Sequence, residues 1–243
     1  MKISEFLFRF RRIALIAVFA VAFWAPWERM GGTHPGSTWL WLAGTIAAMG
    51  FFPIATSTIV VIALATFALL LASLVRTWAT AYLGSDVVYD KDLHSERVVA
   101  DGPYRYVRNP LYLGTWLLTA AISVLMPPGG ALFALVTVTL LIVAWVLAEE
   151  RKLTIERGDA YTSYLNKVPR FLPAIAPRIL AGPALPDWLQ GFVGEIHLWG
   201  MAITYLVFAH RYNVTILEQG VLISVGLTFL VRAIWRPAIP ANS

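Results

Sequence analysis

The stretch that decides the fold is Asp101-Gly-Pro-Tyr-Arg-Tyr-Val-Arg-Asn-Pro-Leu-Tyr-Leu-Gly114, which two apolar runs separate from Glu149-Glu150. Asn109 suits a helix N-cap, because its side-chain oxygen can accept from a free amide of the first turn. Pro110 suits the first helical position, where its missing N–H costs nothing. We therefore expect a helix to begin at about residue 110.

The expected helix runs to Met126, where Pro127-Pro128-Gly129-Gly130 predicts a tight reversal from missing donors and positive φ. A second helix is expected over 131–148. At about 1.5 Å per residue the chain rises roughly 21 Å from Tyr112 and returns roughly 27 Å. Glu149 should therefore lie near Asn109 and Tyr112. The polar segment and the acidic pair then share one membrane depth, which predicts a cofactor site on a helical hairpin.

The composition predicts an all-α fold, a polytopic membrane helix bundle with six or seven membrane segments. Of 243 residues, 58% are hydrophobic and 14% charged, with mean hydropathy +0.69, which no single soluble core with a polar shell accommodates. Several runs are at the short end of the roughly 17–25 residues needed to span. The apolar runs are Ile13–Trp27, Thr38–Ala55, Ser57–Val75, Leu111–Met126, Ala131–Ala148, Ile196–Ala209 and Val214–Val231.

The N-terminal segment leaves the topology open. Its Lys2, Arg9, Arg11 and Arg12 precede an apolar run and imitate a cleavable signal peptide, although an uncleaved anchor or interfacial segment is the favoured interpretation. Counting crossings back from a cytoplasmic 76–110 loop places this basic end outside, against the positive-inside tendency. Either 13–27 does not fully cross, or 38–75, broken at Pro53, is not two ordinary spans. We favour the first.

Charge and residue usage exclude several classes of protein. There is no cysteine, and the four histidines are scattered, so thiolate sites, disulfides and a histidine-ligated di-iron centre are not expected. Of 19 basic residues, 11 fall in 76–110 and 149–178, mixed with 9 acidic ones. These stretches are typical of cytoplasmic loops facing anionic headgroups. The net charge of +5 therefore gives no support for nucleic-acid binding.

The organisation along the chain predicts one membrane domain over 1–243, with a catalytic core at 86–173 and a C-terminal membrane hairpin at 187–243. The second helix of the central hairpin should continue to about Arg157, with Gly158 as its C-cap. Asp159 then caps a short helix ended by Pro169. A proline-rich stretch, 173–186, links this polar lobe to the last hairpin, which carries no evident chemistry.

The acidic pair is the strongest single chemical signal. Carboxylates at a membrane helix end are costly unless paired, although an isolated pair usually marks an interfacial helix end. One carboxylate could hold an ammonium group. Tyr104, Tyr106 and Tyr112 could flank an adenine or a cation, but tyrosines are also ordinary residues of the aromatic belt.

Together these residues resemble the isoprenylcysteine carboxyl methyltransferase and phospholipid methyltransferase superfamily of integral membrane enzymes. The resemblance spans roughly residues 86–173, and the combination of motifs is more specific than any one of them. The matching segments, in order, are Glu96-Arg-Val-Val99, Gly102-Pro-Tyr104, Arg108-Asn-Pro-Leu-Tyr-Leu-Gly114, Glu149-Glu-Arg-Lys-Leu153, Gly158-Asp-Ala-Tyr161, Tyr164 and Val168-Pro-Arg170.

The resemblance implies S-adenosylmethionine bound in a cytoplasmic lobe at the end of the hairpin, with Glu149 neutralising its α-ammonium. It also implies a lipophilic small molecule or lipid as methyl acceptor, with membrane lipids as surroundings. We expect a bacterial inner membrane with the active site facing the cytoplasm, and no metal. The cofactor residues carried over are Glu96, Arg97, Val98, Val99, Tyr104, Asn109, Pro110, Leu111, Tyr112 and Glu149.

Two departures from the family pattern bear on the chemistry. Asn109 and Glu96 replace motif histidines, and because Asn109 cannot titrate near neutrality, base chemistry at position 109 is not expected. Trp145 replaces an arginine that holds a substrate carboxylate in the prenylcysteine enzymes, which puts a carboxylate acceptor in doubt. Arg151 and Arg105 are the first candidates for a replacement cation. The alternatives are an NADPH-dependent membrane reductase of similar fold, which needs phosphate contacts, and a non-catalytic scaffold or transporter.

Overall fold

The computed structural model describes residues 11–27, 36–89 and 101–234, and over these residues the protein is entirely helical. The predicted all-α fold is confirmed for this part of the chain. The helices are α2 (Arg11–Trp24), α3 (Thr38–Ala48), α4 (Ile54–Tyr89), the 3₁₀ turn η1 (Gly102–Arg105), α5 (Pro110–Ser123), α6 (Pro128–Lys167), α7 (Trp188–Gly194), α8 (Ile196–Arg211) and α9 (Val214–Ile234).

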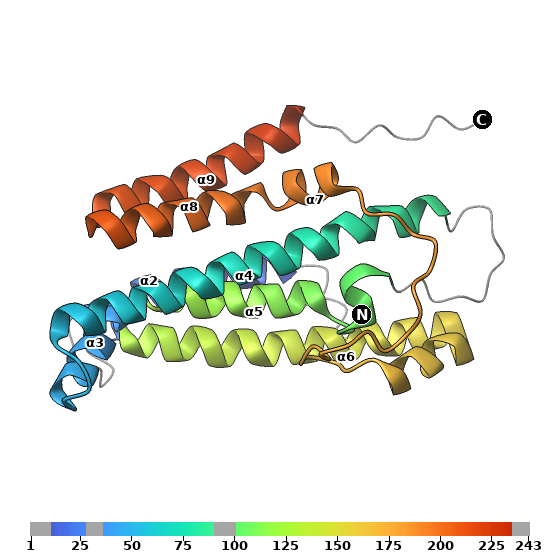
Figure 1. Ribbon diagram of the computed structural model, residues 1–243, viewed down its shortest axis with the longest axis horizontal. Coiled ribbons are helices and arrows are strands. Elements are labelled where there is room, and N and C mark those ends of the chain that lie inside the picture. The colour runs from blue at the N-terminus through green and yellow to red at the C-terminus, as the bar shows by residue number, and fades with distance from the viewer. Residues whose placement is uncertain (1–10, 28–35, 90–100, 235–243) are drawn as a thin grey trace.

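The long helix α4 organises one side of the bundle. It packs against α3, α5, α7 and α8, while α9 packs on α8 (Figure 1). The core between them is apolar, with Leu69 of α4 and Leu198 of α8 both fully buried. The Tyr205 hydroxyl donates to the Ala121 carbonyl oxygen at 2.9 Å, which satisfies its one polar atom and fixes α8 against α5.

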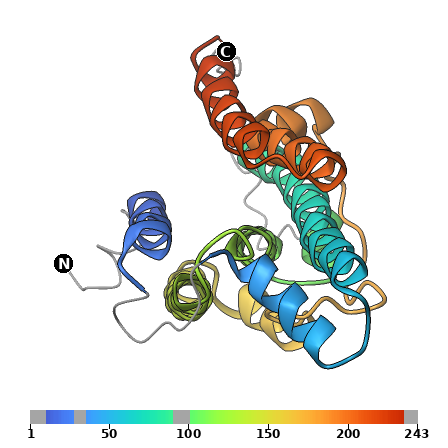
Figure 2. The same ribbon diagram turned by 90° about the vertical axis from the view of Figure 1, so that its left-hand side faces the viewer.

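The other side of the bundle is formed by α2 and α6. In the end-on view α2 lies beside α6, whereas α8 and α9 lie beside α4 (Figure 2). Val138 and Trp145 of α6 are buried in the apolar cluster that also contains Ala22 of α2. Helix α2 is short and buries one face on α6. Its stability therefore comes more from this packing than from its length.

Helix α5 begins at Pro110 as predicted, but the reversal after it is built differently. The helix ends at Ser123, and α6 begins at Pro128, so both glycines of the expected turn lie in its first turn and neither has positive φ. They are needed for close packing: a Cβ at Gly130 would collide with the Ala22 carbonyl. The expectation of a turn that needs positive φ was therefore wrong.

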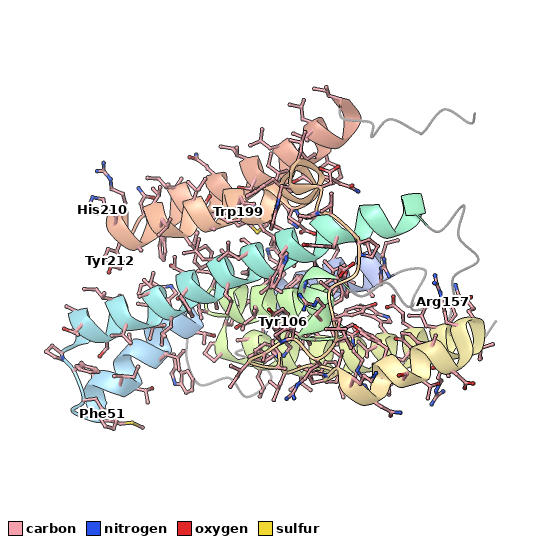
Figure 3. The ribbon with its side chains drawn as sticks, turned by 45° about the vertical axis from the view of Figure 1, so that its right-hand side comes forward. Phe51, Tyr106, Arg157, Trp199, His210 and Tyr212 are labelled. Carbon is pink, nitrogen blue, oxygen red and sulfur yellow. The ribbon has the colours of Figure 1, made fainter. Side chains whose placement is uncertain are left out.

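Toward its C-terminal end, α6 bends where the sequence predicts. Gly158 has φ of 57° and ψ of −132°, which breaks the helical path, and the helix resumes to Lys167. Arg157 lies at the opposite end of the molecule from Phe51, with Tyr106 between them (Figure 3). The charged end of α6 and the apolar α3–α4 corner therefore lie far apart.

By length and apolar composition, two described helices could cross a membrane, Ile54–Leu83 and Pro128–Lys167. A third is possible if α7 and α8, bent by 64°, form one span. The other expected segments form shorter apolar helices, Ile13–Trp24, Thr38–Ala48, Pro110–Ser123 and Thr215–Val231. The count of six or seven segments stays a prediction.

Candidate functional site

The polar segment before α5 is a tight turn wedged against α4. Gly102 has φ of 55°, and a Cβ there would collide with the ring of Tyr82. Asp101, which is 4% exposed, accepts hydrogen bonds from the backbone amides of Gly182 and Ala184. The turn is therefore fixed on one side by α4 and on the other by the proline-rich segment.

The chain after α6 is joined to this turn along its length. The Arg108 amide donates to the Pro169 carbonyl oxygen and the Ala174 amide to the Tyr106 carbonyl oxygen, both at 2.9 Å. The Arg105 Nε donates to the Ile179 carbonyl oxygen at 3.1 Å. We call residues 168–187 the strap. The strap covers the turn. Its backbone accepts a hydrogen bond from Arg105, which is one of the proposed substrate cations.

Asn109 occupies the N-cap position of α5, but its side chain does not cap the helix. The Asn109 Nδ2 donates instead to the Arg170 carbonyl oxygen at 3.2 Å. The capping prediction was wrong because the strap offers the amide an acceptor that sequence-local reasoning does not see. Leu111 and Tyr112 follow in the first turn, where helix geometry gives backbone amides no intrahelical acceptor.

The two helices of the hairpin meet as predicted. The Tyr112 hydroxyl donates to Glu149 Oε2 at 3.1 Å, although 37 residues separate the two. The Tyr112 ring also packs on Trp145, with centroids 6.3 Å apart and planes inclined by 31°. Trp145 is 1% exposed, and among the described residues its Nε1 has no hydrogen-bond partner. These three side chains form one end of the candidate site.

Glu150 has different surroundings from Glu149. It is 6% exposed and accepts from Arg108 Nη1 at 2.9 Å. It also accepts from Arg170 Nε at 3.1 Å and from Arg170 Nη2 at 2.8 Å. Two guanidinium groups satisfy and neutralise this buried carboxylate, which fits a structural role. The acidic pair therefore contains one carboxylate committed to arginines and one that faces a tyrosine.

The tyrosines expected to flank a ligand have separate partners. The Tyr106 ring lies 5.8 Å from that of Trp78 on α4. Tyr104 packs against the apolar cluster of Tyr161 and Tyr164, and the Tyr164 hydroxyl donates to the Tyr104 carbonyl oxygen at 2.9 Å. Burial, with the charge of Glu150 adding to it, raises the pKa of Tyr161 to about 12, so its hydroxyl stays protonated at neutral pH.

A buried ion pair that the sequence did not reveal contacts α5 beside the candidate site. Arg76 of α4 donates through Nε and Nη2 to Glu195 at 2.8 and 2.9 Å, and through Nη1 to Thr115 Oγ1 at 2.9 Å. Glu195 is 4% exposed and also accepts from Thr80 Oγ1. A Cβ at Gly114 would collide with the Arg76 side chain. The lack of a side chain at Gly114 therefore leaves the space that the Arg76 side chain occupies.

A second residue that the sequence did not single out for the site is Arg11. It is the first residue of α2 and is exposed. Its positive charge acts on the Tyr112 hydroxyl. Only the packing of α2 on α6 brings it there, so no spacing in the sequence signals it.

The remaining predicted residues are placed as follows. Glu96, Arg97, Val98 and Val99 lie outside the described residues. Arg151 is exposed on α6. Within the described ranges no three His, Cys, Asp or Glu side chains come together in a group that could hold a metal ion.

Comparison with known proteins identifies the segment that carries this site. Residues 42–157 match the phospholipid methyltransferase family, and this range contains the polar turn, the hairpin and the acidic pair. The methanethiol S-methyltransferase of Crocosphaera subtropica is 36% identical over 75 residues, which are 31% of this chain and 29% of that protein. No solved structure matches. The resemblance to this family that the sequence motifs indicated is confirmed over these residues.

Proposed function

We propose that this protein, whose residues 42–157 match the phospholipid methyltransferase family, is an S-adenosylmethionine-dependent methyltransferase of the membrane. Its acceptor is a lipophilic small molecule that enters from the bilayer. The catalytic core is 86–173, and the site faces the cytoplasm of a bacterial cell from the inner membrane.

The observation that carries the proposal is the contrast within the acidic pair. Glu150 is satisfied by Arg108 and Arg170, whereas the described contact of Glu149 is the Tyr112 hydroxyl. A carboxylate has about four acceptor positions, so one hydroxyl leaves capacity for an ammonium group. Glu149 thus fits the α-ammonium of S-adenosylmethionine, and pairing in a poorly solvated site strengthens that contact.

The first turn of α5 adds donors to the same place. The backbone amides of Leu111 and Tyr112 lie in the first turn, and helix N-termini favour negative or electron-rich groups. We assign these two residues, with Asn109, Pro110 and Tyr104, to the cofactor. Glu96, Arg97, Val98 and Val99 complete the proposed set.

The acceptor side of the site is marked by Trp145. Its buried indole N–H has no partner among the described residues, and a donor left unsatisfied costs about 1–3 kcal/mol. A ligand atom with a lone pair would satisfy it. The relative named as a methanethiol S-methyltransferase acts, by its name, on a small thiol. Lipophilic thiols are therefore the first acceptors to test, ahead of lipid amines.

The chemistry is a displacement at carbon. If S-adenosylmethionine were held by Glu149 and the first turn of α5, it would supply a methyl group on a positively charged sulfur. That methyl group would pass to a lone pair of the acceptor, and the electrons of the broken carbon–sulfur bond would return to sulfur. The protein residues hold the donor, align the acceptor and exclude water. Asn109 cannot titrate near neutrality, so it is not the base that removes any acceptor proton.

The test is a ligand panel on the purified full chain in detergent. S-adenosylhomocysteine should raise the melting temperature by mass action, and NADPH should not. A shift with NADPH alone would favour a reductase and contradict the proposal. Transfer of a labelled methyl group to lipophilic thiols then tests the reaction itself. Absence of both binding and transfer, in protein shown to be folded, would reject it.

A further inference from the structure

Arg76 lies within the candidate membrane span Ile54–Leu83 of α4, where an arginine is costly unless it has partners. Glu195 neutralises it and accepts from its Nε and Nη2 at 2.8 and 2.9 Å. Two apolar side chains of similar volume would often be as stable in such a place, because desolvation of the charges offsets their attraction. Net stability is therefore a weak reason for this pair.

The remaining Nη1 group of Arg76 contacts the beginning of α5. It donates to the Leu111 carbonyl oxygen at 3.2 Å and to Thr115 Oγ1 at 2.9 Å. The Thr115 hydroxyl donates in turn to the same carbonyl oxygen at 3.0 Å. Leu111 lies in the first turn of α5, and the ends of helices fray where no outside group holds them. Arg76 and Thr115 thus hold this turn in place.

The same turn reaches the candidate donor site through its next residue. Tyr112 follows Leu111, and its hydroxyl donates to Glu149 Oε2 at 3.1 Å. The backbone amides of Leu111 and Tyr112 are the donors assigned above to the cofactor. A continuous series of contacts therefore runs from Glu195, through Arg76 and the first turn of α5, to Glu149.

Glu195 comes from the C-terminal part of the chain, outside the residues 42–157 that match the family. It lies between α7 and α8, where the chain bends by 64°. Helix α7 packs on α4 so closely that a Cβ at Gly191 would collide with the Thr77 carbonyl oxygen. The Trp199 indole of α8 donates to Thr77 Oγ1 at 2.9 Å. The bend between α7 and α8 therefore places the Glu195 carboxylate against α4.

We propose that Arg76 is a positioning residue of the donor site, held against the first turn of α5 by Glu195. The inference rests on the proposed function. It gives the C-terminal hairpin a role in donor binding, because that hairpin supplies the carboxylate that holds Arg76. The pair should then control affinity for the donor separately from the stability of the fold.

The first test separates these two effects in the full chain in detergent. The double variant Arg76→Met with Glu195→Leu should keep most of the melting temperature, since apolar side chains replace both charges. It should bind S-adenosylhomocysteine about tenfold more weakly by calorimetry, and the KM for S-adenosylmethionine should rise by about the same factor. The KM for the acceptor should stay within about twofold. Glu218→Gln, at an exposed glutamate of α9, is the control and should change neither KM.

Two threonines of α5 give a matched pair of variants that leaves the ion pair intact. Thr115→Val removes the hydroxyl that joins Arg76 to the Leu111 carbonyl and should weaken S-adenosylhomocysteine binding about 3- to 10-fold. Thr115→Ser keeps that hydroxyl and should restore the affinity. Thr119→Val removes a buried hydroxyl one turn later, which donates to the Thr115 carbonyl oxygen. This control should bind within about twofold of the wild type.

A folded double variant with wild-type affinity for S-adenosylhomocysteine would overturn the positioning role. If the double variant fails to fold, the threonine pair decides, and equal affinities of Thr115→Val and Thr119→Val contradict the proposal. Wild-type protein that binds no S-adenosylhomocysteine would overturn the proposed function and the positioning role together. Normal binding by the wild type and by every variant would overturn the positioning role alone.

Discussion

Glu149 and Glu150 are consecutive in the chain, yet one faces the Tyr112 hydroxyl and the other is held by two arginines. The difference arises because successive residues of a helix point about 100° apart. Arg108 and Arg170 donate to Glu150, one from the turn before α5 and one from the strap. Two identical consecutive residues thus have different surroundings and, we expect, different roles.

This division predicts opposite phenotypes for two matched changes. Glu149→Gln should weaken S-adenosylhomocysteine binding by about 1.5–3 kcal/mol, the scale of a hydrogen bond to a charged group, and keep the melting temperature. Glu150→Gln should lower stability by about 2–4 kcal/mol, because it leaves two guanidinium groups without their carboxylate. Calorimetry and thermal unfolding in detergent measure the two effects. A larger loss of affinity in folded Glu150→Gln would reverse the assignment.

The motif glycine of α5 predicts a steric phenotype. Gly114→Ala should lower the melting temperature by several degrees and weaken ligand binding, because its Cβ collides with Arg76 and displaces the ion pair with Glu195. Gly44→Ala is the matched control. Nothing lies within 4 Å of a Cβ there, so this helical substitution should be neutral or stabilising by up to about 1 kcal/mol. Equal behaviour of the two variants would contradict the steric account.

The ion pair itself gives a third prediction. Glu195→Leu should destabilise the protein by about 3–5 kcal/mol, since it leaves Arg76 charged and largely buried. The double variant Arg76→Met with Glu195→Leu should recover much of that loss, because apolar side chains often replace a buried pair without cost. Thermal unfolding of Glu195→Leu, Arg76→Met and the double variant measures the recovery. A double variant as unstable as the sum of the single changes would show that the two residues act independently.

The sequence predicted what local geometry determines. The start of α5 at Pro110, the bend at Gly158 and the meeting of Tyr112 with Glu149 follow from proline chemistry, glycine conformation and helical rise. The prediction from sequence was wrong where a side chain binds a partner that is distant in the sequence. Asn109 binds the Arg170 carbonyl, 61 residues away.

The charged groups missed by the sequence share that cause. Arg76 and Glu195 are 119 residues apart, and nothing local in either segment signals the other. Arg11 reaches the site only because α2 packs on α6. Such contacts depend on tertiary packing, which spacing along one chain does not encode.

The last prediction concerns the acceptor and rests on Trp145. Its indole offers an apolar wall, a π-face and one N–H donor, but no positive charge, so the acceptor should be neutral or cationic. Purified protein with labelled S-adenosylmethionine can be offered lipophilic thiols, lipid amines and a prenylated cysteine with a free carboxyl group. Transfer to thiols or amines is expected, and Trp145→Phe, which keeps the wall and removes the donor, should slow it by about 10-fold. Efficient methylation of the prenylcysteine carboxylate alone would contradict this account, and Arg11, Arg151 and Arg105 would then be the cations to test.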